Sequence, residues 1–323
     1  MKTNRLQAFE KGHVRLVEED LPEVGSDEVL LKTIYSTISP GTELAWINHM
    51  ANTPGIYPYY PGYSAVARIE EVGENVKNLK AGDVVAANIS HESYSLKNAD
   101  KVTLADPDMD LQEVSAFRLA SISLQGVRKA DIQIGDDIAV IGLGAIGNLA
   151  SQLAHVAGAG TVIGFDTVDW RRNIAAYCGI MNLESNCCDE KFLNRFDVVF
   201  EATGVPAVVN AALEMVKPLG TVILLGSTRG LTDGVNFYKN VHRKGITMIG
   251  AHEMHRARSE EDRFGHFRSN KYDEATIIKL LEAKRICIKP LINALVKPIQ
   301  AQDIYEKLLS KDNQMILAAF DWR

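Results

Sequence analysis

The chain has 323 residues, of which 46% are hydrophobic and 24% are charged, and its formal net charge is −6 at pH 7. This length predicts about two domains, and the composition is ordinary for a folded globular protein. An acidic balance without a long basic run argues against nucleic acid or an anionic membrane as the partner.

No segment predicts export or membrane insertion. Residues 1–20 lack the apolar core of a signal peptide, and no later run is long and apolar enough to span a bilayer. We therefore expect a cytoplasmic protein. Its four cysteines lack the two-residue spacing of a zinc knuckle and are expected to be reduced thiols.

The first part of the chain, residues 1–117, contains short runs of apolar and polar residues punctuated by Gly, Pro and Asn. Such runs predict strands joined by turns. The predicted strands are residues 13–20, 28–38, 64–73 and 82–87. This part is therefore expected to be a β-rich domain.

Residues 118–265 alternate strands with helices. The predicted strands are mostly continuous apolar runs, which indicates a parallel sheet covered on both faces and hence an α/β fold. They are residues 137–142, 161–166, 197–203, 221–227 and 245–251. Apolar residues at helical spacing predict helices over 145–158, 169–179 and 206–220.

The tail, residues 266–323, predicts two amphipathic helices over 274–286 and 301–313 and a strand over 314–322. We expect this tail to return to the first domain.

The most specific motif is the stretch "DIAVIGLGAIGNLA", in which a predicted strand leads through a GxGxxG spacing into a predicted helix. Gly142 permits the tight turn, Gly144 lets a pyrophosphate approach the backbone, and Gly147 allows close helix–strand packing. Amides at the helix start attract phosphate, which brings the intervening loop residues into the predicted site. These are Leu143, Ala145 and Ile146. The motif predicts dinucleotide binding.

The second predicted strand of this domain ends in Asp166, about 20 residues after the glycines, as in the dinucleotide fingerprint. Its carboxylate favours NAD(H), because it accepts hydrogen bonds from ribose hydroxyls and repels a 2′-phosphate. Arg171 and Arg172 leave NADP(H) open, and Arg171 could also stack on the adenine. The ends of the next two strands supply further expected cofactor contacts. They are Thr203, Gly204, Gly226, Ser227 and Thr228.

Four stretches in this order resemble the medium-chain dehydrogenase/reductase superfamily of zinc alcohol dehydrogenases and quinone reductases. They are "VGENVKNLKAGDVVA", "GLGAIG", "FDVVFEATG" and "GTVILLGS". The resemblance implies a GroES-like catalytic domain over 1–117 and a Rossmann NAD(P)-binding domain over 118–265. It also implies an active site between the domains and a homodimer paired through the strand near "GITMIGA".

"ISPGTE", "YPGYSAV" and "HRKGITMIGAH" further resemble a zinc-lacking branch that includes bacteriochlorophyllide a dehydrogenase. The positions of the zinc ligands in the superfamily fall at or near Ser39, Tyr63 and Phe117. Neither hydroxyls nor a phenyl ring bind Zn²⁺ well, so we expect no metal. An alternative is that Glu43 and His91 rebuild a metal site.

Without zinc, hydrogen-bond donors must stabilise the oxygen that develops negative charge during hydride transfer. Tyr63 is the predicted donor, with Ser39 and Thr42 continuing a hydroxyl relay, Glu43 orienting it and His91 linking it to solvent. Three of these residues also have a structural interpretation: Tyr63 as a core tyrosine, Glu43 as a helix-capping or salt-bridging residue, and His91 as a structural histidine.

The sequence therefore predicts a zinc-independent, NAD(H)-dependent oxidoreductase acting on a small alcohol or carbonyl compound. Conjugate reduction of enones or quinones, and NAD(H) binding without catalysis, remain as alternatives.

Overall fold

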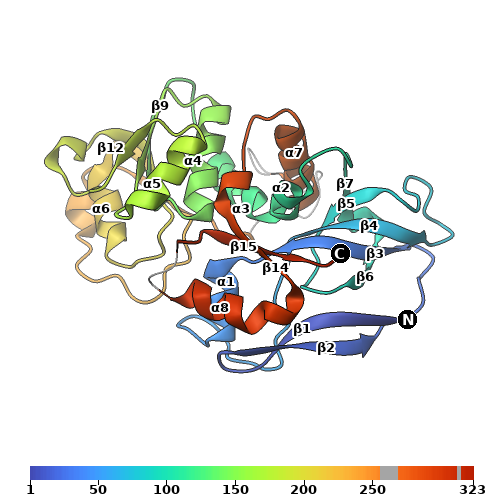
Figure 1. The fold of residues 1–323 in the computed structure, drawn as a ribbon. Helices are drawn as coiled ribbons and strands as arrows, with labels where there is room; N and C mark the ends of the chain where they lie inside the picture. The colour runs from blue at the N-terminus through green and yellow to red at the C-terminus, as the bar shows by residue number, and fades with distance from the viewer. Residues whose placement is uncertain (255–267, 311–313) are drawn as a thin grey trace. The chain divides into compact units, whose positions relative to one another are not determined.

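The computed structural model describes residues 1–254, 268–310 and 314–323. The chain forms two compact units: the first comprises Met1–Arg118 and Glu274–Arg323, and the second comprises Leu119–Asp273 (Figure 1). The expected domain boundary between residues 265 and 266 lies outside the described residues.

The first unit contains a two-stranded antiparallel sheet and a larger sheet of seven strands. The small sheet pairs β1 (Lys2–Glu10) with β2 (His13–Asp20). The large sheet has the order β14-β15-β3-β4-β5-β7, and β6 also pairs with β3. Its strands are β3 (Glu28–Thr37), β4 (Ala65–Val72), β5 (Val84–Ala87), β6 (Tyr94–Asn98), β7 (Val102–Ala105), β14 (Ile292–Val296) and β15 (Leu317–Asp321).

Two apolar clusters hold the first unit together. One lies within the large sheet and includes Leu31, Ala67 and Val85. The other lies between β1, α1 (Pro40–Ile47), α8 (Ala301–Leu309) and β15, so the C-terminal segment packs on the N-terminal strands. Figure 1 shows α8 beside α1 and the β1–β2 pair.

The second unit is built on a six-stranded parallel sheet with the order β10-β9-β8-β11-β12-β13. Its strands are β8 (Asp137–Ile141), β9 (Thr161–Phe165), β10 (Asn182–Glu184), β11 (Phe196–Glu201), β12 (Val216–Leu224) and β13 (Thr247–Gly250). Helices α4 (Ala145–Ala157) and α5 (Asp169–Tyr177) pack on β8–β10, and α6 (Val208–Met215) packs on β11 and β12. Central strands are buried, as continuous apolar runs require.

The remaining helices are α2 (Leu111–Ser115), α3 (Phe117–Ala130) and α7 (Asn270–Glu282). Short single turns lie at Ala99–Lys101, Glu190–Phe192, Tyr238–His242, Lys289–Leu291 and Pro298–Gln300.

The structure confirms the predicted α/β class, with a strand-rich part and a parallel sheet. One predicted helix was too long: residues 206–220 form α6 only as far as Met215, and β12 begins at Val216. Leu219 adopts a positive φ of 65°, which is incompatible with continuing the helix. The sequence analysis did not predict the strands β1, β6, β7, β10 and β14 or the helices α1, α2 and α3.

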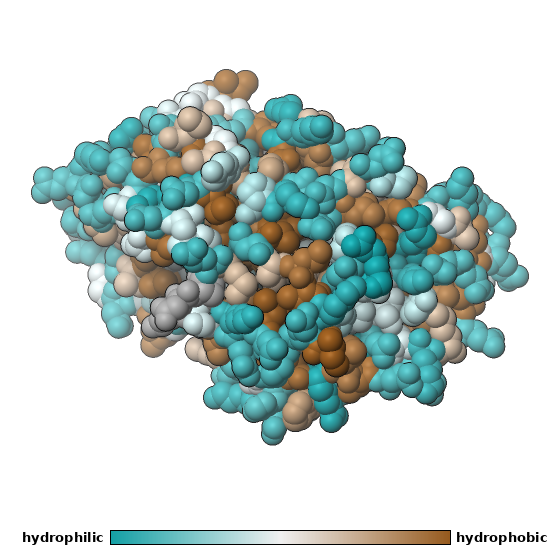
Figure 2. All heavy atoms as spheres, viewed as in Figure 1, coloured by the Kyte–Doolittle hydropathy of each residue, from teal (hydrophilic) through white to brown (hydrophobic). Residues whose placement is uncertain are grey.

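Hydrophilic residues cover most of the face shown in Figure 2, with apolar residues between them. Such a mixture is normal for a folded protein surface. Within the residues described, no helix is long and apolar enough to cross a membrane.

Candidate functional site

Two hydroxyl groups meet in the first unit. Tyr63 lies two residues before β4 and donates a hydrogen bond to Ser39 Oγ at 2.5 Å. Ser39 is the N-cap of α1, whose first residue, Pro40, favours helix initiation. Tyr63 is half-buried and Ser39 is 6% exposed. Tyr63 and Ser39, 24 residues apart, are thus direct partners.

Gly62 determines the backbone conformation immediately before Tyr63. Its φ is +95°, and a Cβ there would lie 2.6 Å from the backbone nitrogen of His91. Only glycine fits both the conformation and the space.

Glu43 and His91 lie behind this hydroxyl pair, and both side chains are fully buried. Glu43 Oε1 accepts a hydrogen bond from the Ser39 amide at 2.7 Å, and its Oε2 lies 3.0 Å from His91 Nε2. Tyr305, from α8, also donates to Glu43 Oε2. Four of the five expected catalytic residues are therefore linked in one network.

The structure differs from the predicted relay in two details, the hydroxyl of Thr42 and the solvent link of His91. Thr42 is half-buried, and among the described residues no hydrogen bond joins its hydroxyl to Ser39 or Tyr63. His91 is 0% exposed, so its ring does not reach solvent. Its Nδ1 instead lies 2.7 Å from Ser36 Oγ.

The residues at the expected zinc-ligand positions, and the alternative pair Glu43 and His91, do not fit a zinc ion. Ser39 and Tyr63 offer neutral hydroxyls, which are bonded to each other, and Phe117 offers no donor atom. Both nitrogens of His91 and both oxygens of Glu43 already have hydrogen-bond partners. Over the described parts of the chain, no three His, Cys, Asp or Glu side chains gather as a metal site would require.

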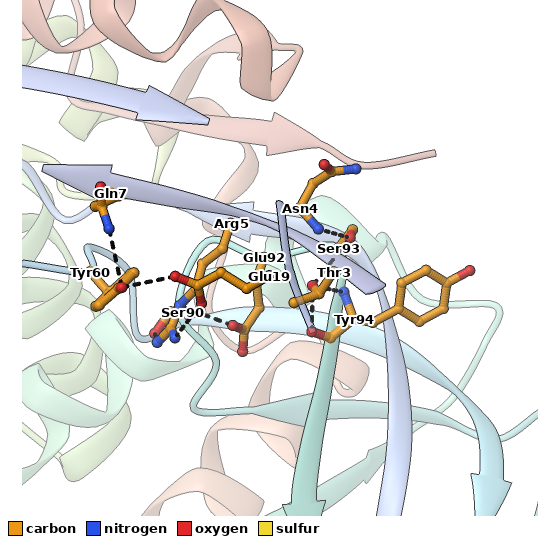
Figure 3. A network of polar contacts seen from close by, with 10 residues as sticks. All are labelled: Thr3, Asn4, Arg5, Gln7, Glu19, Tyr60, Ser90, Glu92, Ser93 and Tyr94. Carbon is orange, nitrogen blue, oxygen red and sulfur yellow. Dashed lines mark hydrogen bonds and ion pairs between the residues drawn. The ribbon is translucent and has the colours of Figure 1, made fainter. Parts of the chain in front are cut away.

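Three nearby tyrosines have distinct roles. Tyr57 donates to the Ile47 carbonyl at 2.8 Å, and Tyr60 donates to Glu19 at 2.8 Å in the polar network of Figure 3. Tyr59 stacks on Trp46 with ring centroids 5.1 Å apart. Burial, and then the nearby Glu43 carboxyl group and Tyr63 phenol, raise the pKa of Tyr59. Tyr59 therefore stays protonated beside the hydroxyl pair.

The glycine-rich loop of the second unit has the geometry that its sequence predicts. Gly142 has a φ of +94°, and a Cβ there would lie 2.8 Å from Thr203 Cγ2. A Cβ on Gly147 would lie 1.7 Å from the Gly142 carbonyl oxygen, whereas one on Gly144 would meet nothing within 4 Å. The loop thus packs tightly at both ends and stays open at Gly144, where α4 begins.

Asp166 follows β9 and is anchored to this loop. Its Oδ2 accepts a hydrogen bond from the Leu143 amide, and its Oδ1 accepts one from the Val168 amide, each at 2.9 Å. Arg171 Nη1 lies 3.7 Å from Oδ2. Arg172 bonds the Asp166 carbonyl and the Asp169 carboxylate. The Asp166 carboxylate is therefore held at the glycine loop.

The loops after β11 and β12 meet beside the glycine loop, because β8, β11 and β12 are parallel neighbours. A Cβ on Gly204 would lie 2.6 Å from the Ser227 carbonyl oxygen, and one on Gly226 would lie 2.5 Å from the Gly204 nitrogen. Thr228 lines a cavity of about 550 Å³ within this unit. The expected cofactor residues thus come from the segments after β8, β9, β11 and β12; Ala145 and Ile146 begin α4, and Arg171 lies in α5.

Glu201, which sequence reasoning missed, organises the loop after β11. Its Oε1 accepts from the amides of Thr203 at 2.7 Å and Gly204 at 3.1 Å. Its Oε2 is buried without a hydrogen-bond partner among the described residues, and burial raises the pKa of this carboxyl group. Its place at the end of a buried strand, in "EATG", was the available signal.

These features define a two-unit protein with a dinucleotide-binding type of parallel sheet and a separate, polar hydroxyl site. Residues 25–114 match the family described as "Alcohol dehydrogenase GroES-like domain", and residues 145–264 match "Zinc-binding dehydrogenase". The chain belongs to the medium-chain dehydrogenase/reductase superfamily.

Several characterised proteins are similar. An NADPH-dependent alkenal/one oxidoreductase of Arabidopsis thaliana is 27% identical over 64% of this chain, and the match spans 56% of that protein. An L-threonine 3-dehydrogenase of Caldanaerobacter subterraneus is 25% identical over 77% of this chain and 83% of its own length. The structure of galactitol-1-phosphate dehydrogenase from Escherichia coli matches 98% of this chain and 99% of its own with a TM-score of 0.82 and 21% identity, which is a likeness of fold.

Proposed function

We propose that this protein is an NAD(H)-dependent oxidoreductase that transfers hydride between nicotinamide and an alcohol or carbonyl substrate without zinc. The observation that carries the proposal is the Tyr63–Ser39 hydroxyl pair, at the positions where zinc-dependent members of the superfamily bind metal. Membership of the superfamily and the open glycine loop support the cofactor class.

In this proposal the cofactor supplies or accepts the hydride, and the chain supplies its binding site. The amides around Gly144 at the start of α4 would hold the pyrophosphate. The loops containing Thr203, Gly204, Gly226, Ser227 and Thr228 would line the same crevice, because ligands of parallel sheets bind at the carboxyl ends of strands.

NAD(H) is proposed over NADP(H) because the Asp166 carboxylate is fixed at the glycine loop by two amides. A carboxylate there accepts from ribose hydroxyls and repels a 2′-phosphate. Arg171, 3.7 Å from the same oxygen, offsets part of that charge.

The substrate oxygen would be held by the hydroxyl pair. Tyr63 donates to Ser39, so the Ser39 proton is available for a substrate oxygen. Hydrogen bonds of this kind stabilise an oxygen that gains negative charge as hydride arrives. Proton transfer from the same hydroxyl would complete the reduction of a carbonyl to an alcohol.

A second candidate is conjugate reduction of an enone, in which hydride adds to the β-carbon and a proton is delivered to the α-carbon of the resulting enolate. The similarity to the alkenal/one oxidoreductase favours it. A non-catalytic NAD(H)-binding protein is the third candidate.

Further parts of the proposal are a place in the zinc-lacking branch, a cytoplasmic location and a homodimer. Pairing through β13 is supported by its position at the edge of the parallel sheet, since an unpaired apolar edge strand favours association.

The test compares Tyr63→Phe with Tyr57→Phe, a matched loss of a hydroxyl whose partner is the Ile47 carbonyl. With NADH and a panel of carbonyls and enones, Tyr63→Phe should lower kcat about 100-fold with unchanged NADH affinity. Tyr57→Phe should leave kcat near the wild-type value. Equal effects of the two substitutions would refute the catalytic role of Tyr63, and no turnover by the wild type would favour the non-catalytic candidate.

A further inference from the structure

A buried polar cluster lies behind the hydroxyl pair and draws on distant parts of the first unit. Its members are Ser36 of β3, Glu43 of α1, His91, Tyr305 of α8 and Trp322 after β15. The side chains of Ser36, Glu43 and His91 are 0% exposed. We call these five residues the buried cluster.

Hydrogen bonds join the members of the buried cluster in a chain. Trp322 Nε1, which is only a donor, gives its proton to Ser36 Oγ at 2.9 Å. The same Ser36 Oγ lies 2.7 Å from His91 Nδ1. Because the Glu43 carboxylate can only accept, we assign the His91 proton to Nε2, which lies 3.0 Å from Glu43 Oε2, so that Nδ1 accepts from Ser36.

The carboxylate of Glu43 is the single formal charge of the buried cluster in this arrangement. A buried carboxylate is stable only when donors satisfy its oxygens. Glu43 has three: His91, Tyr305 and the Ser39 amide. Burial and the neighbouring Glu43 charge raise the pKa of Tyr305, which keeps its hydroxyl a donor.

One oxygen of the Glu43 carboxylate is linked to the hydroxyl pair through Ser39. Glu43 Oε1 holds the Ser39 amide, and Ser39 Oγ accepts from Tyr63. Displacing Glu43 would release the backbone amide of Ser39, the N-cap of α1, and with it the Ser39 hydroxyl.

We propose that Tyr305 is a positioning residue: together with a neutral His91 it orients Glu43, which in turn fixes Ser39 and its bond to Tyr63. The effect on catalysis rests on the proposed function, whereas the bonding within the buried cluster does not.

The experiment removes one hydroxyl with Tyr305→Phe. Its matched control is Tyr60→Phe, because the Tyr60 hydroxyl bonds Glu19 and Gln7 in a network separate from the buried cluster (Figure 3). Tyr305→Phe should lower kcat about tenfold or more with NADH affinity unchanged, since small displacements of a reacting group are costly. Tyr60→Phe should keep kcat near the wild-type value. Equal kcat values for the two variants would overturn the positioning role.

Two NMR readouts test the same proposal without a substrate. In ¹⁵N-labelled wild-type protein, the His91 ring, assigned from its missing signal in His91→Gln, should be the neutral Nε2–H tautomer. Solvent exchange of the Ser39 amide should accelerate in Tyr305→Phe and not in Tyr60→Phe. An imidazolium or an Nδ1–H tautomer, or unchanged Ser39 exchange, would overturn the proposal. Absence of turnover in the wild type would instead contradict the proposed function and leave these readouts decisive.

Discussion

Gly147→Ala should displace the glycine loop, although alanine ordinarily stabilises a helix by about 1 kcal/mol relative to glycine. Gly147 lies in the first turn of α4, and its Cβ would lie 1.7 Å from the Gly142 carbonyl oxygen and 2.9 Å from its carbon. Both atoms are backbone, so no side-chain rotation relieves the contact.

The size of the effect follows from these distances. The carbonyl oxygen must retreat by more than 1 Å to reach 3.0 Å, below which real Cβ contacts essentially never occur. Overpacking of this kind costs about 1–3 kcal/mol or more, which outweighs the gain from helix propensity. We expect the free energy of unfolding to fall by about 2 kcal/mol and NADH affinity to fall at least about tenfold.

Gly144→Ala is the matched control for folding, because its Cβ would meet no atom within 4 Å. Its stability should equal that of the wild type or exceed it, while NADH affinity falls because the methyl group occupies space left for the phosphates. Urea unfolding and NADH fluorescence titration measure both quantities. Wild-type stability and NADH affinity in Gly147→Ala would refute this reasoning.

Three further substitutions test other parts of the two sites. Asp166→Ser should weaken NADH binding more than NADPH binding. In a fluorescence titration, the ratio of Kd for NADPH to Kd for NADH should therefore fall about tenfold. Gly62→Ala should lower the free energy of unfolding by about 1–3 kcal/mol, because its Cβ would lie 2.6 Å from the His91 nitrogen; an unchanged urea midpoint would contradict the close packing. Burial raises the pKa of Glu201 above its ordinary value of 4.5, so the folded state binds this proton more tightly than the unfolded chain. The stability that this proton provides is complete below pH 4.5 and is lost as the pH rises through the raised pKa. Glu201→Gln should therefore gain stability relative to the wild type as the pH rises toward neutrality, and a pH-independent difference in urea unfolding would contradict the assignment.

The sequence predicted the second unit more fully than the first, because its signals are local. Strand, glycine loop, helix, second strand and acid follow one another between Asp137 and Asp166, and the turn at Gly142 and the packing at Gly147 depend on those same residues. The end of α6 was misjudged because Pro218 and Gly220 were taken as the close of the helix, whereas the chain already leaves the helix at Val216, which pairs with Phe196 in the sheet.

The hydroxyl site depends instead on contacts between residues far apart in the chain. The resemblance to zinc enzymes predicted that Ser39 and Tyr63 belong to one site. No local pattern predicts the hydrogen bond between Tyr305 and Glu43, which are 262 positions apart. In the sequence, Tyr305 is one apolar position of an amphipathic helix. Its hydroxyl partner follows only from the packing of α8 on α1.

The most direct test of the central claim is steady-state turnover of chelator-treated protein whose metal content is measured in the same sample. With NADH and a carbonyl or enone substrate, we predict full turnover at no more than trace zinc, and no gain when zinc is added back. Activity that disappears with the metal and returns with stoichiometric zinc would contradict hydride transfer supported by the Tyr63–Ser39 pair.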